Sequence, residues 1–419
     1  MAGEWTTLPL EDCMAAIIDY RGKSPDKTTF GVPLVTAKIV KGGRIEKPEE
    51  FIAESDFDDW MRRGMPKPGD IVMTTEAPLG EVAQLDGRKV ALAQRVITLR
   101  GKPDVLDNTF LKFLLQSNPV QEELRSRGTG TTVVGIRQSE LRKVSLTLPP
   151  LAEQKAIAAV LGALDDKIEL NRRMNATLEA MARALFQSWF VDFDPVRAKL
   201  DGRPPAALDP ATAALFPATF QDSPFGEIPH GWRVGTLGEL VQLRTDRVDA
   251  TPAKDSTRYI ALEDMPSKSI DLSNFQLGSA VNSSITAFRK GDVLFGSMRP
   301  YFHKVGLAFF DGITRTTTFV LRPRKDCFRH FALLYFFSDD VVAHSTTASV
   351  GTTIPYVRWD SLESYRIPTP PDSLLAAFEK SVSPLVQRIA TQGEESRTLA
   401  TLRDTLLPKL LSGELKAIG

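Results

Sequence analysis

Two long stretches of the chain carry apolar side chains at alternating spacings of four and three residues. The first runs from Ile157 to Leu185, and the second runs from Phe378 to Leu406. An apolar period of 3.5 residues, sustained over several heptads, is typical of a coiled-coil seam. We therefore expect two long helices, over residues 151–190 and 371–413, that each bury one face against a partner helix.

The two seams share a polar centre. Asn171 and Asn175 interrupt the first seam, and Gln392 and Ser396 interrupt the second. Buried polar seam residues cost stability but select register and partner, so the two helices are expected to pair with each other. The predicted seam positions are Ile157, Leu161, Leu164, Ile168, Asn171, Asn175, Leu178, Ala182 and Leu185, then Phe378, Val382, Leu385, Ile389, Gln392, Ser396, Leu399, Arg403 and Leu406. Pro384 predicts a kink or a late start of the second helix, because proline lacks the N–H.

The seams belong to a duplication that covers nearly the whole chain. Asn171 and Gln392 are 221 residues apart (392 − 171 = 221). Other pairs at this or a slightly larger offset are Arg137 with Arg358, Pro149 with Pro370, Gly69-Asp70 with Gly291-Asp292, and Trp5 with Trp232. A period of this size predicts two similar domains and argues against a solenoid of small repeats.

Each copy begins with a globular stretch of mixed character. Short β-branched or aromatic runs, such as 69–74 and 291–295, alternate with turns and with helix-like patches at 108–117 and 327–338. The expected fold class is mixed α/β (α+β), with two globular domains in tandem repeat and two long helices pairing as an antiparallel coiled coil. The expected layout is a first domain over 1–150, a helix over 151–190, an irregular linker over 191–229, a second domain over 230–370 and a helix over 371–413.

Composition narrows the function classes. Lys and Arg together number 52, as do Asp and Glu, so the formal net charge is zero and a general non-specific nucleic-acid binder is disfavoured. Cys13 and Cys327 lack both disulfide and metal-ligand patterns, which suits two free thiols in a reducing cytoplasm. The start of the sequence shows no signal peptide, and no apolar run reaches the roughly 20 residues of a membrane span.

Catalytic motifs are absent from the sequence. Gly22-Lys23-Ser24 has the ending of a phosphate-binding loop, but Ile17 stands where the first glycine belongs. No dinucleotide loop, zinc motif or nucleophile elbow occurs. The four histidines, His230, His303, His330 and His344, suggest no catalytic triad. We therefore expect no active site, no metal and no cofactor in this chain.

Several stretches resemble the specificity (S) subunits of type I restriction-modification systems. They are Leu148–Ile157 leading into Leu164–Ile168 and Asn171, Leu185–Asp194, Phe216–Trp232, Leu399–Glu414, Asp19–Pro25 and Val32–Lys38. The resemblance covers the full chain and retains its repeat; Pro384 departs from it and puts only the local helix geometry in doubt.

The resemblance implies a non-catalytic subunit that reads a bipartite double-stranded DNA target, with one half-site per target-recognition domain. It implies two modification (methyltransferase) subunits, which dock on the helices and methylate adenine N6 with S-adenosylmethionine. It also implies restriction (translocase and nuclease) subunits that use ATP and Mg²⁺. The alternatives are a duplicated coiled-coil protein adaptor, a self-contained methyltransferase or nuclease, and a specificity subunit of a methylation-only or type II-like complex.

If two equivalent domains face one duplex, a pseudo-twofold axis relates them and makes the helices that follow them antiparallel. A helix of about 38 residues is about 57 Å long, at about 1.5 Å per residue. Such a pair would hold the domains a fixed distance apart, and the alternative is that the coil only dimerises the fold or the protein.

DNA contacts are expected at basic, hydroxyl and turn-rich runs, because these groups suit phosphates and base edges. In the first domain the candidates are Arg21, Lys23, Lys38, Lys41, Arg44, Arg125, Arg127, Thr129, Thr131 and Arg137. In the second they are Arg244, Arg247, Arg258, Arg299, Tyr301, His303, Lys304, Thr352, Thr353 and Arg358. Because Arg137 and Arg358 recur at one position, they predict either a shared backbone contact or a structural ion pair.

Overall fold

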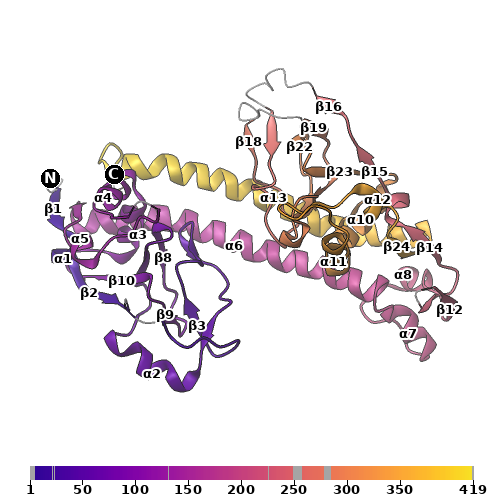
Figure 1. The fold of residues 1–419 in the computed structure, drawn as a ribbon, viewed down its shortest axis with the longest axis horizontal. Coiled ribbons are helices and arrows are strands. Elements are labelled where there is room, and N and C mark those ends of the chain that lie inside the picture. Colours follow the sequence, from indigo (N-terminus) through magenta and orange to yellow (C-terminus); the bar gives the residue numbers. More distant parts are fainter. Residues whose placement is uncertain are drawn as a thin grey trace. The chain divides into compact units, whose positions relative to one another are not determined.

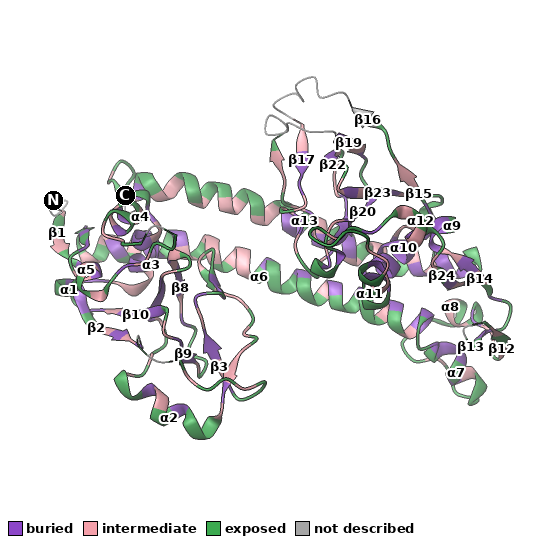
Figure 2. Cartoon of the chain, viewed as in Figure 1, coloured by how far each residue is buried: buried purple, intermediate pink, exposed green. Residues whose placement is uncertain are grey.

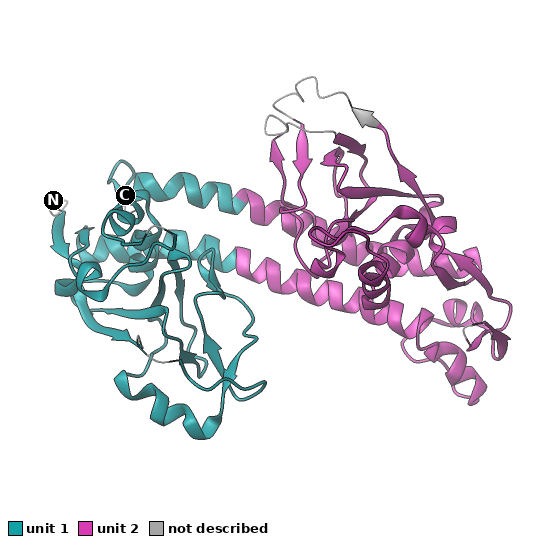
Figure 3. Cartoon of the chain, in the orientation of Figure 1, with its two compact units in different colours: residues 1–167, 399–419 teal, residues 168–398 magenta. Residues whose placement is uncertain are grey.

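The computed structural model describes residues 5–20, 22, 24–130, 132–224, 226–248, 257–277 and 285–417, except for the side chains of Arg247 and Val248 (Figure 1). The chain divides into two compact units (Figure 3). Unit 1 comprises residues 1–167 and 399–419, and unit 2 comprises residues 168–398. Each long helix contributes one part to each unit.

Unit 1 is built on a four-stranded antiparallel sheet in the order β2-β10-β7-β8. The strands are β2 (Met14–Asp19), β10 (Val96–Gly101), β7 (Ile71–Thr75) and β8 (Leu79–Gln84). Every residue of β7 is buried. Ile71 and Met73 belong to one core cluster and Val72 to another, because successive side chains of a strand point to opposite faces.

The two faces of this sheet are covered differently. Helices α3 (Asn108–Gln116) and α4 (Asn118–Ser126) complete the first core. The second core includes residues of the small sheet β6-β3-β9, with β6 (Phe51–Ile52), β3 (Val32–Val35) and β9 (Ala91–Leu92), and of α2 (Phe57–Trp60). The remaining elements are β1 (Thr6–Pro9) paired with β11 (Ser145–Leu148), the hairpin β4 (Val40–Lys41)–β5 (Arg44–Ile45), and the one-turn helices α1 (Leu10–Cys13) and α5 (Gln138–Leu141).

Unit 2 repeats this framework. Its four-stranded sheet is β15 (Val241–Arg244), β23 (Thr318–Pro323), β20 (Val293–Gly296) and β21 (Val305–Leu307), in that order. Leu321 pairs with Val293, just as Leu99 pairs with Ile71 in unit 1. The equivalents of the unit 1 helices and of its β1-β11 pair are α10 (Arg329–Phe336), α11 (Asp339–Thr347), α9 (Leu237–Leu240), α12 (Trp359–Glu363), and β14 (Arg233–Thr236) with β24 (Arg366–Thr369). The duplication seen in the sequence is therefore a duplication of strand order and register.

The units differ in their outer sheets. Unit 2 carries a five-stranded sheet in the order β16-β19-β22-β17-β18. Its strands are β16 (Arg247–Val248), β19 (Ile285–Phe288), β22 (Gly312–Arg315), β17 (Arg258–Ile260) and β18 (Gln276–Leu277). The shared framework therefore carries a different outer layer in each unit.

The long helices are α6 (Leu151–Phe190) and α13 (Asp372–Leu411), and they pack together as an antiparallel pair. Within unit 2, Asn171 contacts Glu395 and Ser396, whereas Asn175, one turn later, contacts the carbonyl of Ile389. The predicted pairing is confirmed, and each predicted seam position is buried or half-buried (Figure 2).

Pro384 does not delay or interrupt α13, so the late helix start is a wrong prediction. Its ring lies on the exposed face of the helix, and Lys380 is exposed as well. Water can therefore solvate the carbonyl that loses its N–H partner, which lowers the cost of proline inside the helix.

Buried polar contacts attach the globular part of unit 2 to α6. Asn175 Nδ2 donates to Asp271 Oδ2 at 3.1 Å. Glu179 Oε2 accepts from the backbone N–H of Ile270 and from Ser269 Oγ, both at 3.0 Å. Burial raises the pKa of both carboxyl groups. In unit 1, Asp165 plays a similar part, because it accepts from Lys112 at 2.6 Å and from Arg403 of α13 at 2.8 Å.

The segment 191–229 is more ordered than the predicted irregular linker. It contains α7 (Asp194–Leu200), α8 (Pro210–Ala214) and the hairpin β12 (Phe220–Ser223)–β13 (Gly226–Pro229). The Phe193 ring lies 5.6 Å from that of Trp232, and the Phe216 ring lies 5.2 Å from that of Trp189. These side chains belong to the main core of unit 2, which explains the order of a segment rich in Pro and Ala.

Candidate nucleic-acid interface

Each unit carries a loop of the same construction between its last two short helices. The α4–α5 loop comprises residues 127–137, and the α11–α12 loop comprises residues 348–358. Thr129 and Gly135 exchange two backbone hydrogen bonds of 2.8 and 3.0 Å, and Val350 and Tyr356 exchange equivalent bonds of 2.9 and 3.0 Å. The tip of this closed turn contains Gly130 and Thr132 in unit 1, and Gly351, Thr352 and Thr353 in unit 2.

Glycine is required at the start of the turn in unit 1. Gly130 has φ +116°, and a Cβ placed on it would lie 2.1 Å from the carbonyl oxygen of Val133. Gly351 occupies the equivalent place with φ +91°. Side chains are strained in this left-handed region, so the glycines account for the first residue of the repeated motif.

Both loops are hydrogen-bonded to the end of a central sheet strand. The N–H of Ile136 donates to the Thr75 carbonyl of β7 at 2.9 Å, and the N–H of Val357 donates to the carbonyl of Ser297, just after β20, at 2.9 Å. In unit 2 the N–H of Arg299 also donates to the Pro355 carbonyl at 2.7 Å. The sheets therefore hold the two loops in equivalent positions.

The arginines near the unit 1 loop have different environments. Arg125 and Arg137 are exposed, and neither forms an ion pair with another described residue. Arg127, in contrast, pairs with Glu123 at 2.9 Å and with Glu140 at 3.5 Å. Arg125 and Arg137 can therefore reach a phosphate without breaking an ion pair, whereas the two ion pairs of Arg127 stabilise the start of the loop.

A small hollow of about 300 Å³ lies under the unit 1 loop. Its lining includes Gln94 and Arg95 from the turn between β9 and β10, together with Thr129 and Arg137. Arg95 pairs with Glu76 at 2.9 Å. The sequence analysis missed Gln94 and Arg95, because no motif marks them and only the pairing of distant strands places them beside the loop.

The unit 2 loop combines exposed hydroxyl, basic and aromatic groups. Thr352, Thr353, Arg299 and Tyr301 are exposed, and Arg299 forms no ion pair among the described residues. Arg358 precedes α12 as Arg137 precedes α5, and its partner is the exposed Asp360 at 3.1 Å. An exposed pair of this kind is weak, so Arg358 can exchange Asp360 for a phosphate at little cost.

Other predicted contacts of unit 2 are engaged inside the protein. His303 was predicted to contact DNA, but its ring is buried. Its Nε2 lies 2.8 Å from the Phe337 carbonyl, and burial lowers its pKa. Lys304 donates to the Leu262 carbonyl at 2.6 Å, and desolvation lowers its pKa. Arg258 lies over the rings of Phe275 and Phe310, and Arg244 pairs with Asp246 at 2.6 Å. His303, Lys304 and Arg258 thus join separate segments of unit 2, whereas Arg244 forms a local ion pair.

The hairpin β4–β5 of unit 1 presents the remaining basic candidates. Lys41 is exposed, Lys38 pairs with Glu49 at 2.9 Å, and Arg44 lies 3.9 Å from Glu46. Arg21, Lys23, Thr131 and the side chain of Arg247 lie outside the described residues.

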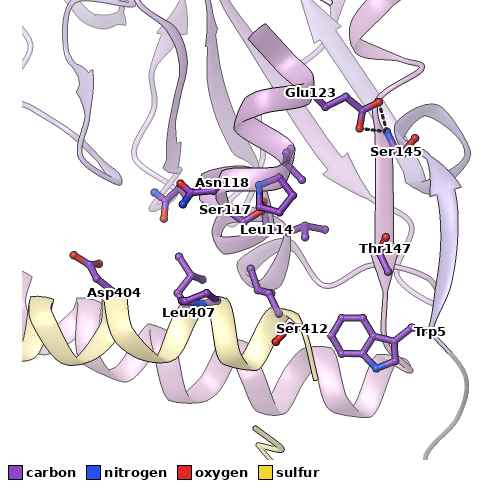
Figure 4. A pocket seen from close by; sticks show the side chains of 15 residues that line it. Trp5, Leu114, Ser117, Asn118, Glu123, Ser145, Thr147, Asp404, Leu407 and Ser412 are labelled. Carbon is purple, nitrogen blue, oxygen red and sulfur yellow. Dashed lines mark hydrogen bonds between the residues drawn. The ribbon is translucent and has the colours of Figure 1, made fainter. Parts of the chain in front are cut away.

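Another hollow of unit 1, of about 870 Å³, lies between the end of α13 and the α3–α4 turn (Figure 4). Leu114, Leu407 and Trp5 line it, and the Glu123 carboxylate at its edge accepts from the N–H of Ser145. This lining contains neither a nucleophile–base pair nor a metal-ligand set. Among the described residues, no cluster of three or more His, Cys, Asp or Glu is arranged to bind a metal, and no helix has the length and hydropathy to cross a bilayer.

Comparisons with known proteins agree with the repeated architecture. The family model described as the type I restriction modification DNA specificity domain matches residues 33–180 and 229–374. The chain is 26% identical over 405 residues to the type I restriction enzyme MjaIX specificity subunit of Methanocaldococcus jannaschii, covering 92% of this chain and 87% of that protein. It is 27% identical over 357 residues to the HindI specificity subunit of Haemophilus influenzae, covering 73% of this chain and 77% of that protein.

A solved structure shares the fold. It is the S subunit of a type I restriction-modification system from M. genitalium, with a TM-score of 0.57, 18% identity, and coverage of 97% of this chain and 96% of that one. The family model alone accounts for well over half of the chain, once in each repeat. The chain therefore belongs to the type I restriction-modification DNA-specificity family, with one specificity domain in each of its two repeats.

Proposed function

We propose that this chain reads a two-part double-stranded DNA sequence, with one half-site for each unit, and performs no chemistry itself. The observation that carries the proposal is the pair of equivalent loops. Each is held on the end of a central strand, and each presents exposed hydroxyl and arginine side chains. Such groups bind phosphates and base edges.

The balanced composition is compatible with this role. The net charge is zero, so the attraction to DNA has to be local. Arg125 and Arg137 supply it in unit 1, and Arg299 and Arg358 supply it in unit 2. Because each loop has, among the described residues, only these two arginines to attract phosphates, we expect the affinity to depend more on base contacts than on general attraction to the DNA backbone.

We further propose that two modification subunits dock on the long helices, and that restriction subunits join the complex. Large apolar side chains that the helix pair leaves exposed support this docking. They are Val160, Leu170, Met174 and Met181 on α6, and Leu402 on α13. Exposed large apolar side chains along a helix suit contacts with other proteins. In this assembly the modification subunits bind S-adenosylmethionine, and the restriction subunits bind ATP and Mg²⁺.

The test is co-expression with a modification subunit of a type I system from the same genome, followed by methylome sequencing. We expect N6-methyladenine at a split, two-part motif, and co-purification of the two proteins. Deletion of residues 230–370 should abolish methylation at that motif. Unchanged methylation without this chain, together with failure to co-purify, would favour the protein-adaptor alternative.

A further inference from the structure

The tips of both loops expose apolar side chains to solvent. In unit 1, Val133 is 52% exposed and Val134 is 41% exposed. In unit 2, Ile354 is 47% exposed and Tyr356 is 46% exposed. We call these four residues the apolar tips. They are flanked by exposed arginines, and apolar side chains rimmed by polar groups mark contact surfaces.

The tip of unit 1 is held in place before any ligand arrives. A Cβ built on Gly128 would lie only 2.7 Å from Val134 Cγ1 and 3.4 Å from Leu79 Cδ2, so Val134 packs against the Gly128 backbone beside β8. The reciprocal bonds between Thr129 and Gly135 close the turn around it. A preorganised contact loses little conformational entropy on binding, which favours specific recognition.

The tip of unit 2 lies beside an exposed aromatic pair, which has no counterpart at the equivalent, described positions of unit 1. The bond from the Arg299 N–H to the Pro355 carbonyl joins the loop to the turn 299–302. In that turn the rings of Tyr301 and Phe302 are 4.8 Å apart, and both are exposed. At the offset of 222 residues (301 − 79 = 222), the equivalents in unit 1 are Leu79 and Gly80.

The backbone of the loop is therefore repeated, while the chemistry of its tip is not. A protein partner common to both units would meet two different surfaces at these tips. Two DNA half-sites of different sequence would each require a reading surface of their own. The arrangement consequently favours DNA as the partner of the tips.

We propose that the apolar tips read base edges, and that the group they recognise is the C5-methyl of thymine in the major groove. That methyl is the apolar group that a base pair presents there, and apolar side chains contact it directly. Val133 and Val134 determine part of one half-site, and Ile354 and Tyr356 determine part of the other. The arginines beside them contact phosphates. This inference rests on the proposed function and adds to it the residues and the base chemistry.

The first experiment compares methylomes of the assembled methyltransferase with wild-type chain, with Val133→Ser/Val134→Ser, and with Ile354→Ser/Tyr356→Ser. Each double variant should relax the motif in one half only, a different half for each. The unaffected half is an internal control for folding and assembly. Val191→Ser is the matched surface control, since Val191 is 41% exposed and lies outside both loops, and it should leave the motif unchanged.

The second experiment uses the wild-type complex and needs no variant. Each thymine of the identified target is replaced by deoxyuridine, which removes only the methyl group. For the wild-type complex we expect about a fourfold loss of affinity per contacted methyl in each half-site.

Two results would overturn the inference. One is equal binding of the thymine and deoxyuridine duplexes by the wild type. The other is a wild-type motif in both double variants, including the case in which they lose a protein partner instead. Failure of the proposed function would look different, because the wild type itself would then produce no split motif.

Discussion

Asp70 and Arg100 form a bidentate ion pair in unit 1, in which Arg100 Nε donates to Oδ1 at 2.7 Å and Nη2 donates to Oδ2 at 2.6 Å. Asp292 and Arg322 repeat it in unit 2 at 2.8 and 2.7 Å. Both aspartates are buried and cap a turn by accepting from the N–H three residues earlier. The duplication has thus retained a complete charged anchor between two strands of each sheet.

Breaking this anchor should destabilise one unit strongly. Arg100→Met leaves the buried Asp70 carboxylate without its counter-charge, and the expected cost is about 3–5 kcal/mol. Urea unfolding of the chain measures it. Arg88→Gln removes an exposed pair with Asp86 and should cost under about 1 kcal/mol; comparable losses in the two variants would contradict the anchoring role.

The helix attachment of unit 2 should respond to pH. Burial raises the pKa of the Glu179 carboxyl in the folded state, so the folded state binds a proton more tightly than the unfolded state does. The contribution of this carboxyl group to stability is therefore fully present below the ordinary pKa of glutamate, and it is lost as the pH rises through the raised value. Asp271, whose pKa is also raised, acts in the same direction.

Glu179→Gln should reduce the loss of stability at higher pH, because the amide oxygen can still accept hydrogen bonds from Ser269 and Ile270 without burying a charge. In thermal unfolding between about pH 4.5 and pH 7.5, the melting temperature of the variant should rise relative to that of the wild type as the pH increases. Parallel curves for the two proteins would mean that Glu179 does not titrate in this range.

Charge reversal at Arg125 and Arg137 should weaken DNA binding by the assembled methyltransferase. Each lost phosphate contact lowers the slope of log affinity against log salt by about 0.9, so the pair should lower it by about 2. Fluorescence anisotropy over a salt series checks this. Arg88→Glu serves as the surface control. An unchanged slope in the double variant would contradict the proposal that the unit 1 loop contacts DNA.

Arg127→Glu should behave differently from those two variants. It places a third carboxylate beside Glu123 and Glu140, so the expected defect is reduced stability of unit 1. Its melting temperature should fall, while Arg125→Glu should melt like the wild type. A normal melting temperature together with a loss of DNA affinity would indicate that Arg127 contacts DNA directly.

The segment 191–229 should behave as part of the core of unit 2. Phe193→Ala removes the ring that packs on Trp232, and the expected loss is about 3–5 kcal/mol. Leu200→Ala, at a largely exposed position of α7, should cost under about 1 kcal/mol. Denaturant unfolding compares them, and equal stabilities would identify the segment as a dispensable linker.

The sequence alone determined the architecture that repeats. The 3.5-residue apolar period identifies both long helices and their seams, because period and burial are properties of a continuous stretch. The matching polar centres identify the partner, and the structure places Asn171 against Ser396. The offset between Gly69-Asp70 and Gly291-Asp292 likewise marks two copies of one sheet.

Only the tertiary structure decided what the individual side chains do. His303 and Arg258 look like exposed DNA contacts in the sequence, but the carbonyl of Phe337 and the rings of Phe275 and Phe310 engage them. Phe193 looks like part of a linker until Trp232 comes to lie beside it. A charged or aromatic side chain takes its role from the groups around it, and those groups come from positions far away along the chain.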